Sequence, residues 1–459
     1  MAGTSLWDYI FIRTSIFLLH LVAPLSVVYS LVRLLVRLPF QFPRVLQAWL
    51  ALEALFYLAV YLPLKEYLQR AAKHPVPPCR ADRRKLFLQC HNNIPDPAQY
   101  LRKWFRNAPA SEIKRDNVKD FFRWAFLNTG EHDPAYEEEL EEYTQEIEKL
   151  LGRKLELGRG NAKSSISLRY HSFNFHRTPF RQFLAIFPPR LFTLFATCTS
   201  PAKSLTYWHR PHTSKTRLPI LFIHGIGVGL YPYINFLADV NAEVDEDPSD
   251  GQVGIIAIEI MSVSSRITYE AMSKEEMCDE IRRTLTAHGW ERCVLVSHSY
   301  GSVVAAQLLR SPEISQNIGP ILFIDPVSFL LHLPDICRRP SQPNEYLLSY
   351  FGSKDIGISH TLFRRFFWAD NLLWKEDIQD RPVTVVLAGR DSVIDTKAIR
   401  AYLLGSDNWA LETTDLMDLG RKDDGLDVIW FQDLDHGQVF DEKRTRSRLV
   451  EIVWTFCKQ

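Results

Sequence analysis

The C-terminal half of this 459-residue chain predicts an α/β fold with a mostly parallel sheet and helices on both faces. From residue 205 onward, short apolar runs alternate with helical stretches, a pattern typical of parallel sheets. One of these runs, 293–296, leads directly into a serine-centred turn and a helix of small residues. Apolar residues make up 46% of the chain, which provides ample material for a large core.

Residues 1–72 predict a membrane-associated segment. Residues 14–32 carry no Asp, Glu, Lys or Arg, and this length can cross the hydrocarbon core of a bilayer. The second apolar run, 45–64, has Glu53 at its centre, which makes a simple span costly. Arginines between the runs leave a span, a hairpin and an interfacial position open.

Two observations favour the cytosol for the rest of the chain. Basic residues follow the second apolar run, as the positive-inside tendency requires of a cytosolic flank. The chain also contains no Asn-x-Ser/Thr acceptor for glycosylation. Its seven cysteines are scattered, which indicates reduced thiols and not a disulfide framework.

Residues 73–200 predict a helical extension that begins with the Pro-rich break at 73–80. Apolar residues recur at helical spacing in 113–126 and in 137–151, and glutamates on the opposite face of the latter predict solvent exposure. After residue 161 comes an aromatic and basic stretch that contains Phe173, Phe183 and Phe192. This stretch either covers a lipid-binding cleft or packs on the core.

The predicted C-terminal domain, 201–459, contains the strand-like runs 218–223, 253–260, 293–296, 320–325, 382–389 and 426–431. Helical patterns between them include 274–288 and 397–404, and a final helix covers 441–456. The interval between the fourth and fifth runs is too long for one helix. Residues from about 327 to 380, rich in Phe, Leu and Trp, therefore predict an inserted cap.

Ser299 is the candidate nucleophile, at the centre of the sequence SHSYG. A strand, a five-residue turn and a helix match a nucleophile elbow, in which a sharp turn presents the serine hydroxyl above the sheet. Small residues two positions before and after the serine avoid a backbone clash, and here they are Ser297 and Gly301. The common pattern has glycine at both positions, so Ser297 is a departure.

A serine nucleophile needs a general base and an acid that orients it. His436 follows the last predicted strand and precedes the final helix, where a loop can bring an imidazole over the elbow. Asp391, just beyond the strand 382–389, is the candidate acid. Asp325, at the end of the run 320–325, is an alternative, as is Asp395, which could instead cap the following helix.

The oxyanion of an acyl-transfer intermediate needs N–H donors. The residue after the nucleophile, Tyr300, supplies one, and the loop HGIGVG (224–229) supplies another, from Ile226 as first choice or Gly225 as second. His224 is expected to order this loop and not to transfer protons. The loop lacks the GxGxxG spacing and has no P-loop lysine, so it does not predict nucleotide binding.

Through HGIG, SHSYG, GRDSVID and DHG, residues 200–459 resemble the α/β-hydrolase superfamily of serine hydrolases, which includes lipases and esterases. The resemblance implies an eight-stranded or similar sheet, a triad of Ser299, His436 and Asp391, and neither metal nor organic cofactor. The first 200 residues lie outside it.

These observations together predict a membrane-associated serine hydrolase that cleaves a carboxylic ester, with a lipid or other hydrophobic acyl ester as substrate. Basic and acidic residues both number 54, so the charge balance gives no support for nucleic acid as a partner. Two alternatives remain. One is a catalytically silent hydrolase-fold scaffold at a membrane, and the other is an acyltransferase or thioesterase with the same triad.

Overall fold

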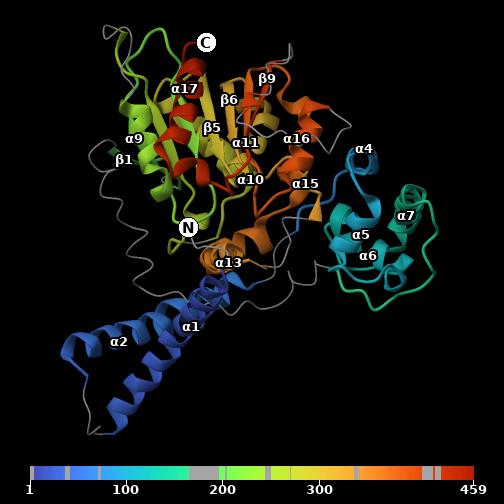
Figure 1. Ribbon diagram of the computed structural model, residues 1–459, viewed down its shortest axis with the longest axis horizontal. Coiled ribbons are helices and arrows are strands. Elements are labelled where there is room, and N and C mark those ends of the chain that lie inside the picture. The colour runs from blue at the N-terminus through green and yellow to red at the C-terminus, as the bar shows by residue number, and fades with distance from the viewer. Residues whose placement is uncertain are drawn as a thin grey trace.

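The computed structural model describes residues 5–36, 42–70, 74–164, 196–201, 204–242, 250–268, 270–334, 340, 342–405, 417–418 and 425–459. Its centre is a nine-stranded sheet with the strand order β1-β2-β4-β3-β5-β6-β7-β9-β8. Figure 1 shows this sheet with helices on both faces, a separate group of helices beside it, and two long N-terminal helices that project from it.

The middle of the sheet consists of parallel strands, and they are the strands that the sequence predicts. Nearly every residue in them is buried, which explains their continuous apolar runs. In spatial order they are β4 (Ile255–Glu259), β3 (Ile220–Ile223), β5 (Cys293–His298), β6 (Ile318–Ile324), β7 (Val383–Ala388) and β9 (Leu426–Phe431).

Three short antiparallel strands at the sheet edges were not predicted. They are β1 (Ala196–Thr199) and β2 (Thr206–Arg210) at one edge and β8 (Met417–Asp418) at the other. Strand β2 reads TYWHR, in which buried and half-buried residues mix, and therefore gives no apolar run. The predicted mostly parallel α/β sheet is confirmed, with these strands added at its edges.

Helices cover the two faces of the sheet over separate apolar cores. Alternate residues of β3 enter each core, with Leu221 and Ile223 on one face and Ile220 and Phe222 on the other. The first face packs against α10 (Lys274–Ala287), α11 (Gly301–Arg310) and α16 (Thr396–Leu404). The second packs against α9 (Ile234–Ala242) and α17 (Lys443–Cys457).

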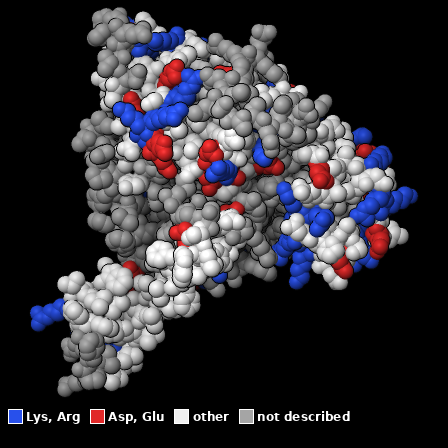
Figure 2. Space-filling model, in the orientation of Figure 1, with Lys and Arg blue, Asp and Glu red and all other residues white. Residues whose placement is uncertain are grey.

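Both N-terminal apolar runs are helical. Helix α1 (Leu6–Leu35) runs outward, and α2 (Arg44–Phe56), a π-helical turn (Tyr57–Tyr61) and α3 (Leu62–Leu68) return beside it as a hairpin. By length and composition both arms could cross a membrane. The hairpin exposes many large apolar side chains, and Figure 2 shows it with few charged ones.

The extension contains the predicted helices, which are α4 (Arg80–Asn92), α5 (Pro97–Trp104), α6 (Arg115–Leu127) and α7 (Glu137–Leu151). Contrary to the expected solvent-exposed glutamate face of α7, Glu139 is only 3% exposed and forms an ion pair with the buried Arg83. The aromatic residues expected after 161, including Phe173, Phe183 and Phe192, lie outside the described residues.

Short helices occupy the predicted cap region between β6 and β7. They are α13 (Pro343–Leu347), the π-helix η10 (Leu348–Ser353), α14 (Ile356–His360), η11 (Thr361–Arg365), α15 (Trp368–Asn371) and η12 (Lys375–Ile378). The base of the hairpin packs on this region. The rings of Tyr9 and Tyr346 lie 5.6 Å apart, and those of His20 and Tyr350 lie 5.2 Å apart.

Candidate active site

Ser299 lies in the tight turn between β5 and α11. Its φ is +49°, a conformation that costs energy for a residue other than glycine and that is typical of functional turns. Its N–H donates to the carbonyl of Ile324 over 3.0 Å, which holds the turn against β6. At Gly301 a Cβ would come within 2.3 Å of the carbonyl oxygen of Ile223, so the turn requires a glycine there.

Ser297, the departure from the common pattern, lies inside β5 and is fully buried. Its hydroxyl has no hydrogen-bond partner among the described residues. A serine therefore fits the turn, but it leaves a buried polar group unpaired. Such groups cost free energy because they lose water without gaining a partner.

Replacing Ser297 by alanine is expected to raise the free energy of unfolding by about 1 kcal/mol, since the variant removes an unpaired hydroxyl and keeps most of the volume. Urea denaturation of both proteins in the same detergent measures the difference. A clear loss of stability in Ser297→Ala would instead indicate a partner for the hydroxyl, such as a buried water molecule.

His436 and Asp391 lie within hydrogen-bond distance of each other and of Ser299. The Nε2 atom of His436 is 2.8 Å from Ser299 Oγ, and its Nδ1 atom is 2.7 Å from Asp391 Oδ2. Because a carboxylate only accepts, Nδ1 carries the proton and Nε2 can accept the serine hydroxyl. The N–H groups of Val393 and Ile394 donate to Asp391 Oδ1 and fix the carboxylate.

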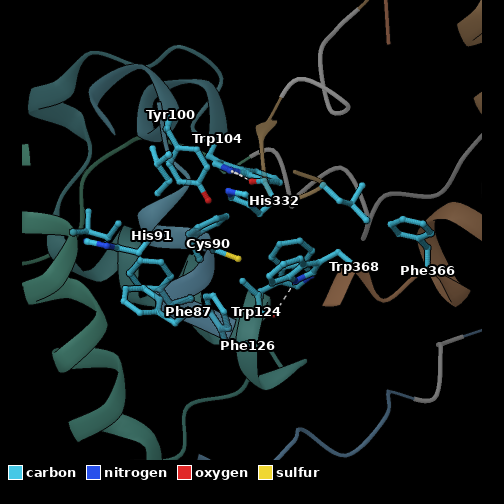
Figure 3. Close-up of a pocket in the computed structure, with 16 residues that line it drawn as sticks. Phe87, Cys90, His91, Tyr100, Trp104, Trp124, Phe126, His332, Phe366 and Trp368 are labelled. Atoms are coloured by element: carbon cyan, nitrogen blue, oxygen red, sulfur yellow. Dashed lines mark hydrogen bonds between the residues drawn. The ribbon is translucent and has the colours of Figure 1, made fainter. Parts of the chain in front are cut away.

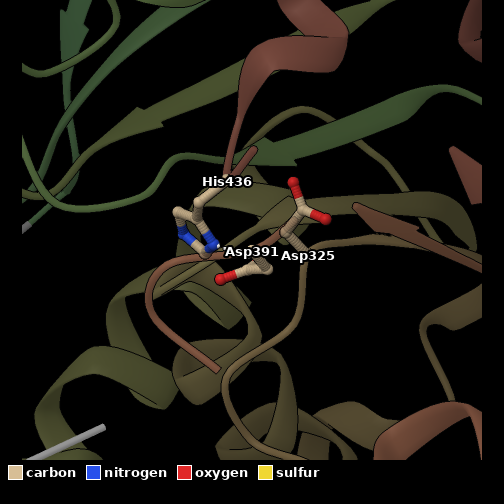
Figure 4. A group of neighbouring side chains, drawn as sticks. All are labelled: Asp325, Asp391 and His436. Atoms are coloured by element: carbon tan, nitrogen blue, oxygen red, sulfur yellow. Dashed lines mark hydrogen bonds and ion pairs between the residues drawn. The ribbon is translucent and has the colours of Figure 1, made fainter. Parts of the chain in front are cut away.

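The other two acid candidates have different partners. Asp325 is buried at the end of β6, where its two oxygens accept the N–H groups of Ala388 and Gly437, each over 2.8 Å. Asp395 caps α16 by accepting the N–H of Ala398 over 3.0 Å. Figure 4 shows Asp325 and Asp391 near His436, but only Asp391 is bonded to the imidazole.

Ligating atoms of Asp325, Asp391 and His436 lie within 4.8 Å of one another and could in principle hold a metal ion. The hydrogen bonds already engage these groups. Both oxygens of Asp325 accept backbone N–H groups, and His436 is bonded through both ring nitrogens. The donor set therefore fits a hydrogen-bonded relay with a supporting carboxylate better than a cation site.

The surrounding charges perturb the ionisable groups of the site. Burial opposes protonation of His436, but the charge and hydrogen bond of Asp391 outweigh it and raise the pKa of the imidazole. Burial raises the pKa of Asp325 to about 7, and the nearby charge of Asp391 acts in the same direction. Asp391 has the largest effect among the carboxylates that raise the pKa of His436, and the charges of Asp325 and Asp435 act in the same direction.

The loop HGIGVG follows β3 and lies beside the elbow. The N–H of Gly225 donates to Tyr233 Oη over 3.0 Å, and that of Gly227 donates to the carbonyl of Val263. Among the described residues, no acceptor is recorded for the N–H groups of Ile226 and Tyr300. The second choice for the oxyanion donor, Gly225, is already engaged by Tyr233.

His224 holds the loop in place. Its Nε2 accepts the N–H of Ile260 over 2.9 Å, so its Nδ1 carries the proton and donates to the carbonyl of Gly225 over 2.6 Å. The side chain is fully buried and makes no bond to Ser299 or His436. This geometry agrees with the expected ordering role.

The sequence analysis missed Tyr233 and His298. The hydroxyl of Tyr233 accepts the N–H of Gly225 and lies 2.7 Å from His298 Nδ1. His298 is buried directly before Ser299, and burial lowers its pKa well below the usual value, so the ring is neutral. The pair joins the loop HGIGVG to the elbow. Neither residue stands out in the sequence, because the elbow pattern allows any residue at 298.

The candidate side chains follow the chain order serine, acid, histidine, each just beyond the carboxyl end of a parallel strand. Ser299 follows β5, Asp391 follows β7 and His436 follows β9, while the glycine-rich loop follows β3. This order on a mostly parallel sheet with a nucleophile elbow identifies the architecture. The chain has the α/β-hydrolase fold.

No protein-family model and no curated protein matches the chain. Solved structures with this hydrolase fold are similar to it, and they include a bacterial membrane phospholipase A, at 13% identity and a TM-score of 0.36, over 60% of this chain and 89% of that one. An esterase from Thermogutta terrifontis has 11% identity and a TM-score of 0.38. The similarity covers 57% of this chain and 99% of that one. The naproxen esterase of Bacillus subtilis has 13% identity and a TM-score of 0.39. The similarity covers 60% of this chain and 97% of that one.

Proposed function

We propose that the protein is a serine hydrolase that cleaves a carboxylic ester through an acyl-enzyme. The observation that carries this proposal is the continuous hydrogen-bond relay from Asp391 through His436 to Ser299. A relay of this kind, with the serine on a strained elbow, is suited to generate a nucleophile when His436 is neutral.

In the proposed mechanism Ser299 Oγ attacks the ester carbonyl while His436 Nε2 takes the hydroxyl proton. Asp391 stabilises the imidazolium, and the N–H groups of Tyr300 and Ile226 bind the oxyanion. When the intermediate collapses, His436 donates the proton to the departing alkoxide. Water then attacks the acyl-enzyme, with His436 as base, and releases the carboxylic acid and free Ser299.

The proposed substrate is a hydrophobic acyl ester, most simply a membrane lipid. The support is a short path from the hairpin to the oxyanion loop. The hairpin base packs on α13 and η10 of the cap, and a Cβ at Gly352 in η10 would lie 3.7 Å from Ile226 Cγ2. A single layer of cap therefore separates the hairpin from one of the two proposed oxyanion donors, which suits a substrate that arrives from a membrane.

A fluorophosphonate probe tests the proposed nucleophile, because it forms a covalent adduct only with an activated serine. The full-length protein is expected to be labelled, and Ser299→Ala is expected to show no labelling. Ser297→Ala serves as the matched control, since it removes a serine of the same turn and should keep the label. An unlabelled wild type, or equal labelling of Ser299→Ala, would contradict the hydrolase proposal and favour a silent scaffold.

Membrane attachment through the hairpin, with the hydrolase domain in the cytosol, is part of the same proposal. Leu18, Leu25 and Leu31 of α1 are each at least half exposed and lie along the projecting arm. Replacing all three by glutamine is expected to release the protein from the membrane pellet, because each side chain loses its burial in hydrocarbon. Leu157→Gln is the control, since Leu157 is 80% exposed on the extension. Recovery of wild type without detergent would contradict the attachment.

A further inference from the structure

An apolar cavity lies outside the candidate active site, between the helical extension and the cap (Figure 3). The space is partly open to solvent. Its walls are mainly aromatic, and the rings come from α4, α5 and α6 on one side and from the cap on the other. The labelled wall residues include Phe87, Trp104, Trp124, Phe126, Phe366 and Trp368.

Hydrogen bonds across the cavity fix its walls. Trp104 Nε1 of α5 donates to the carbonyl of His332 over 3.3 Å, and Trp368 Nε1 of α15 donates to the carbonyl of Ala125 over 2.9 Å. These bonds tie the extension to the residues after β6 and to the cap on either side of the space. An empty apolar space inside a protein costs stability, and the surrounding structure normally closes over it. Because these hydrogen bonds hold the walls apart, the space is suited to bind a ligand.

One buried polar atom at the cavity has no partner. His332 lines the space and is 4% exposed, and its Nε2 lies 3.3 Å from the carbonyl of Asn93. A carbonyl only accepts, so Nε2 carries the proton. Burial lowers the pKa of His332 to about 4, which keeps the ring neutral. Its Nδ1 is therefore a lone-pair acceptor, and it has no partner among the described residues.

We propose that this cavity binds a slender apolar molecule that carries one hydroxyl group. The chain of the ligand would lie among the aromatic rings, and its hydroxyl would donate a hydrogen bond to His332 Nδ1. A fully apolar ligand would leave this buried acceptor unpaired, whereas a charged one would lose its hydration without gaining a counter-charge. An apolar alcohol places its chain against the aromatic walls and its hydroxyl against His332 Nδ1.

The cavity borders the candidate active site without sharing its reactive groups. Phe366 lines the cavity, and its ring lies 6.4 Å from that of Tyr300, the residue after Ser299. Ser299, Asp391 and His436 do not line it. The proposal therefore stands without the proposed hydrolase activity, and either can fail alone.

The experiment compares binding of 1-octanol and its methyl ether, 1-methoxyoctane, to the full-length protein in detergent. Tryptophan fluorescence reports occupancy, because Trp104, Trp124 and Trp368 line the cavity. We expect saturable binding with about tenfold tighter affinity for the alcohol, the ratio typical of one well-formed hydrogen bond in a buried site. Micelles without protein supply the blank for partitioning.

Two variants test the contributions of the cavity walls and of the His332 Nδ1 acceptor one at a time. His332→Phe keeps an aromatic ring of similar size but has no nitrogen that can accept a hydrogen bond, so the preference for the alcohol should disappear while the ether still binds. Ala125→Leu, which fills the space, should abolish binding of both ligands. Circular dichroism checks that each variant is folded.

Equal affinity of the two ligands for the wild-type protein would overturn the proposal. A preference that persists in His332→Phe, or a fluorescence change unaffected by Ala125→Leu, would overturn it as well. Ser299→Ala should bind the alcohol like the wild type, which separates this result from any outcome of the fluorophosphonate experiment.

Discussion

Ser299→Ala and His436→Ala are each expected to lower kcat for ester hydrolysis by about 10⁵- to 10⁶-fold, and the double variant by about the same factor. The reason is that the two groups act in one step. Without His436 no base among the described residues lies within hydrogen-bond distance of Ser299 Oγ, and without the hydroxyl the base has nothing to activate. Turnover of a chromogenic acyl ester by purified proteins measures the three values.

Ser297→Ala is the matched control for this series, and it should hydrolyse the ester at close to the wild-type rate. Losses in the two single variants that multiply in the double variant would show that the serine and the histidine act independently. A residual rate in Ser299→Ala within tenfold of wild type would remove Ser299 from the reaction altogether.

Asp391→Asn is expected to lower kcat by about 10⁴-fold at neutral pH. The asparagine can present an N–H to His436 Nδ1, which favours the tautomer that has its proton on Nε2 and cannot accept one from Ser299. The pH profile should shift too. Only neutral His436 is a base, and Asp391 raises its pKa, so activity should rise with pH through that raised value. Removing the charge should move the midpoint to lower pH.

Asp325→Asn distinguishes the two buried carboxylates. Its oxygens accept the N–H groups of Ala388 and Gly437, so the amide would place a donor against one of them and destabilise the His436 loop. We expect a lower melting temperature and a smaller loss of kcat than in Asp391→Asn. The tautomer of His436 should not change. If Asp325→Asn loses 10⁴-fold while Asp391→Asn stays active, Asp325 is the orienting acid.

The sequence predicted the parallel strands and the order of the candidate site residues because both leave local signals. A strand buried on both faces is a continuous apolar run, and the turns after β5, β7 and β9 place Ser299, Asp391 and His436 at one edge. The sequence favoured Asp391 over Asp325 as the acid but left Asp325 open, because both follow strands of that edge. Only distances show which carboxylate reaches the imidazole.

Other features depend on contacts that are remote in sequence. The N–H of Gly225 is engaged by Tyr233, and Tyr233 in turn reaches His298, so a loop, a 3₁₀ turn and the elbow must meet before the pattern exists. Glu139 looked like part of a solvated helix face, but Arg83 from another helix covers it. The edge strand β2 was missed because its pairing with β4, and not its own composition, makes it a strand.

The packing of the hairpin on α13 and η10 has a consequence for kinetics. With the hairpin in a bilayer, Ser299 would be held at a fixed height above the lipid surface, and the enzyme would search for substrate in two dimensions. Its rate would then follow the mole fraction of ester in the membrane and not its bulk concentration. Dilution of the substrate with an inert lipid would slow hydrolysis, whereas dilution of the vesicles with buffer would not.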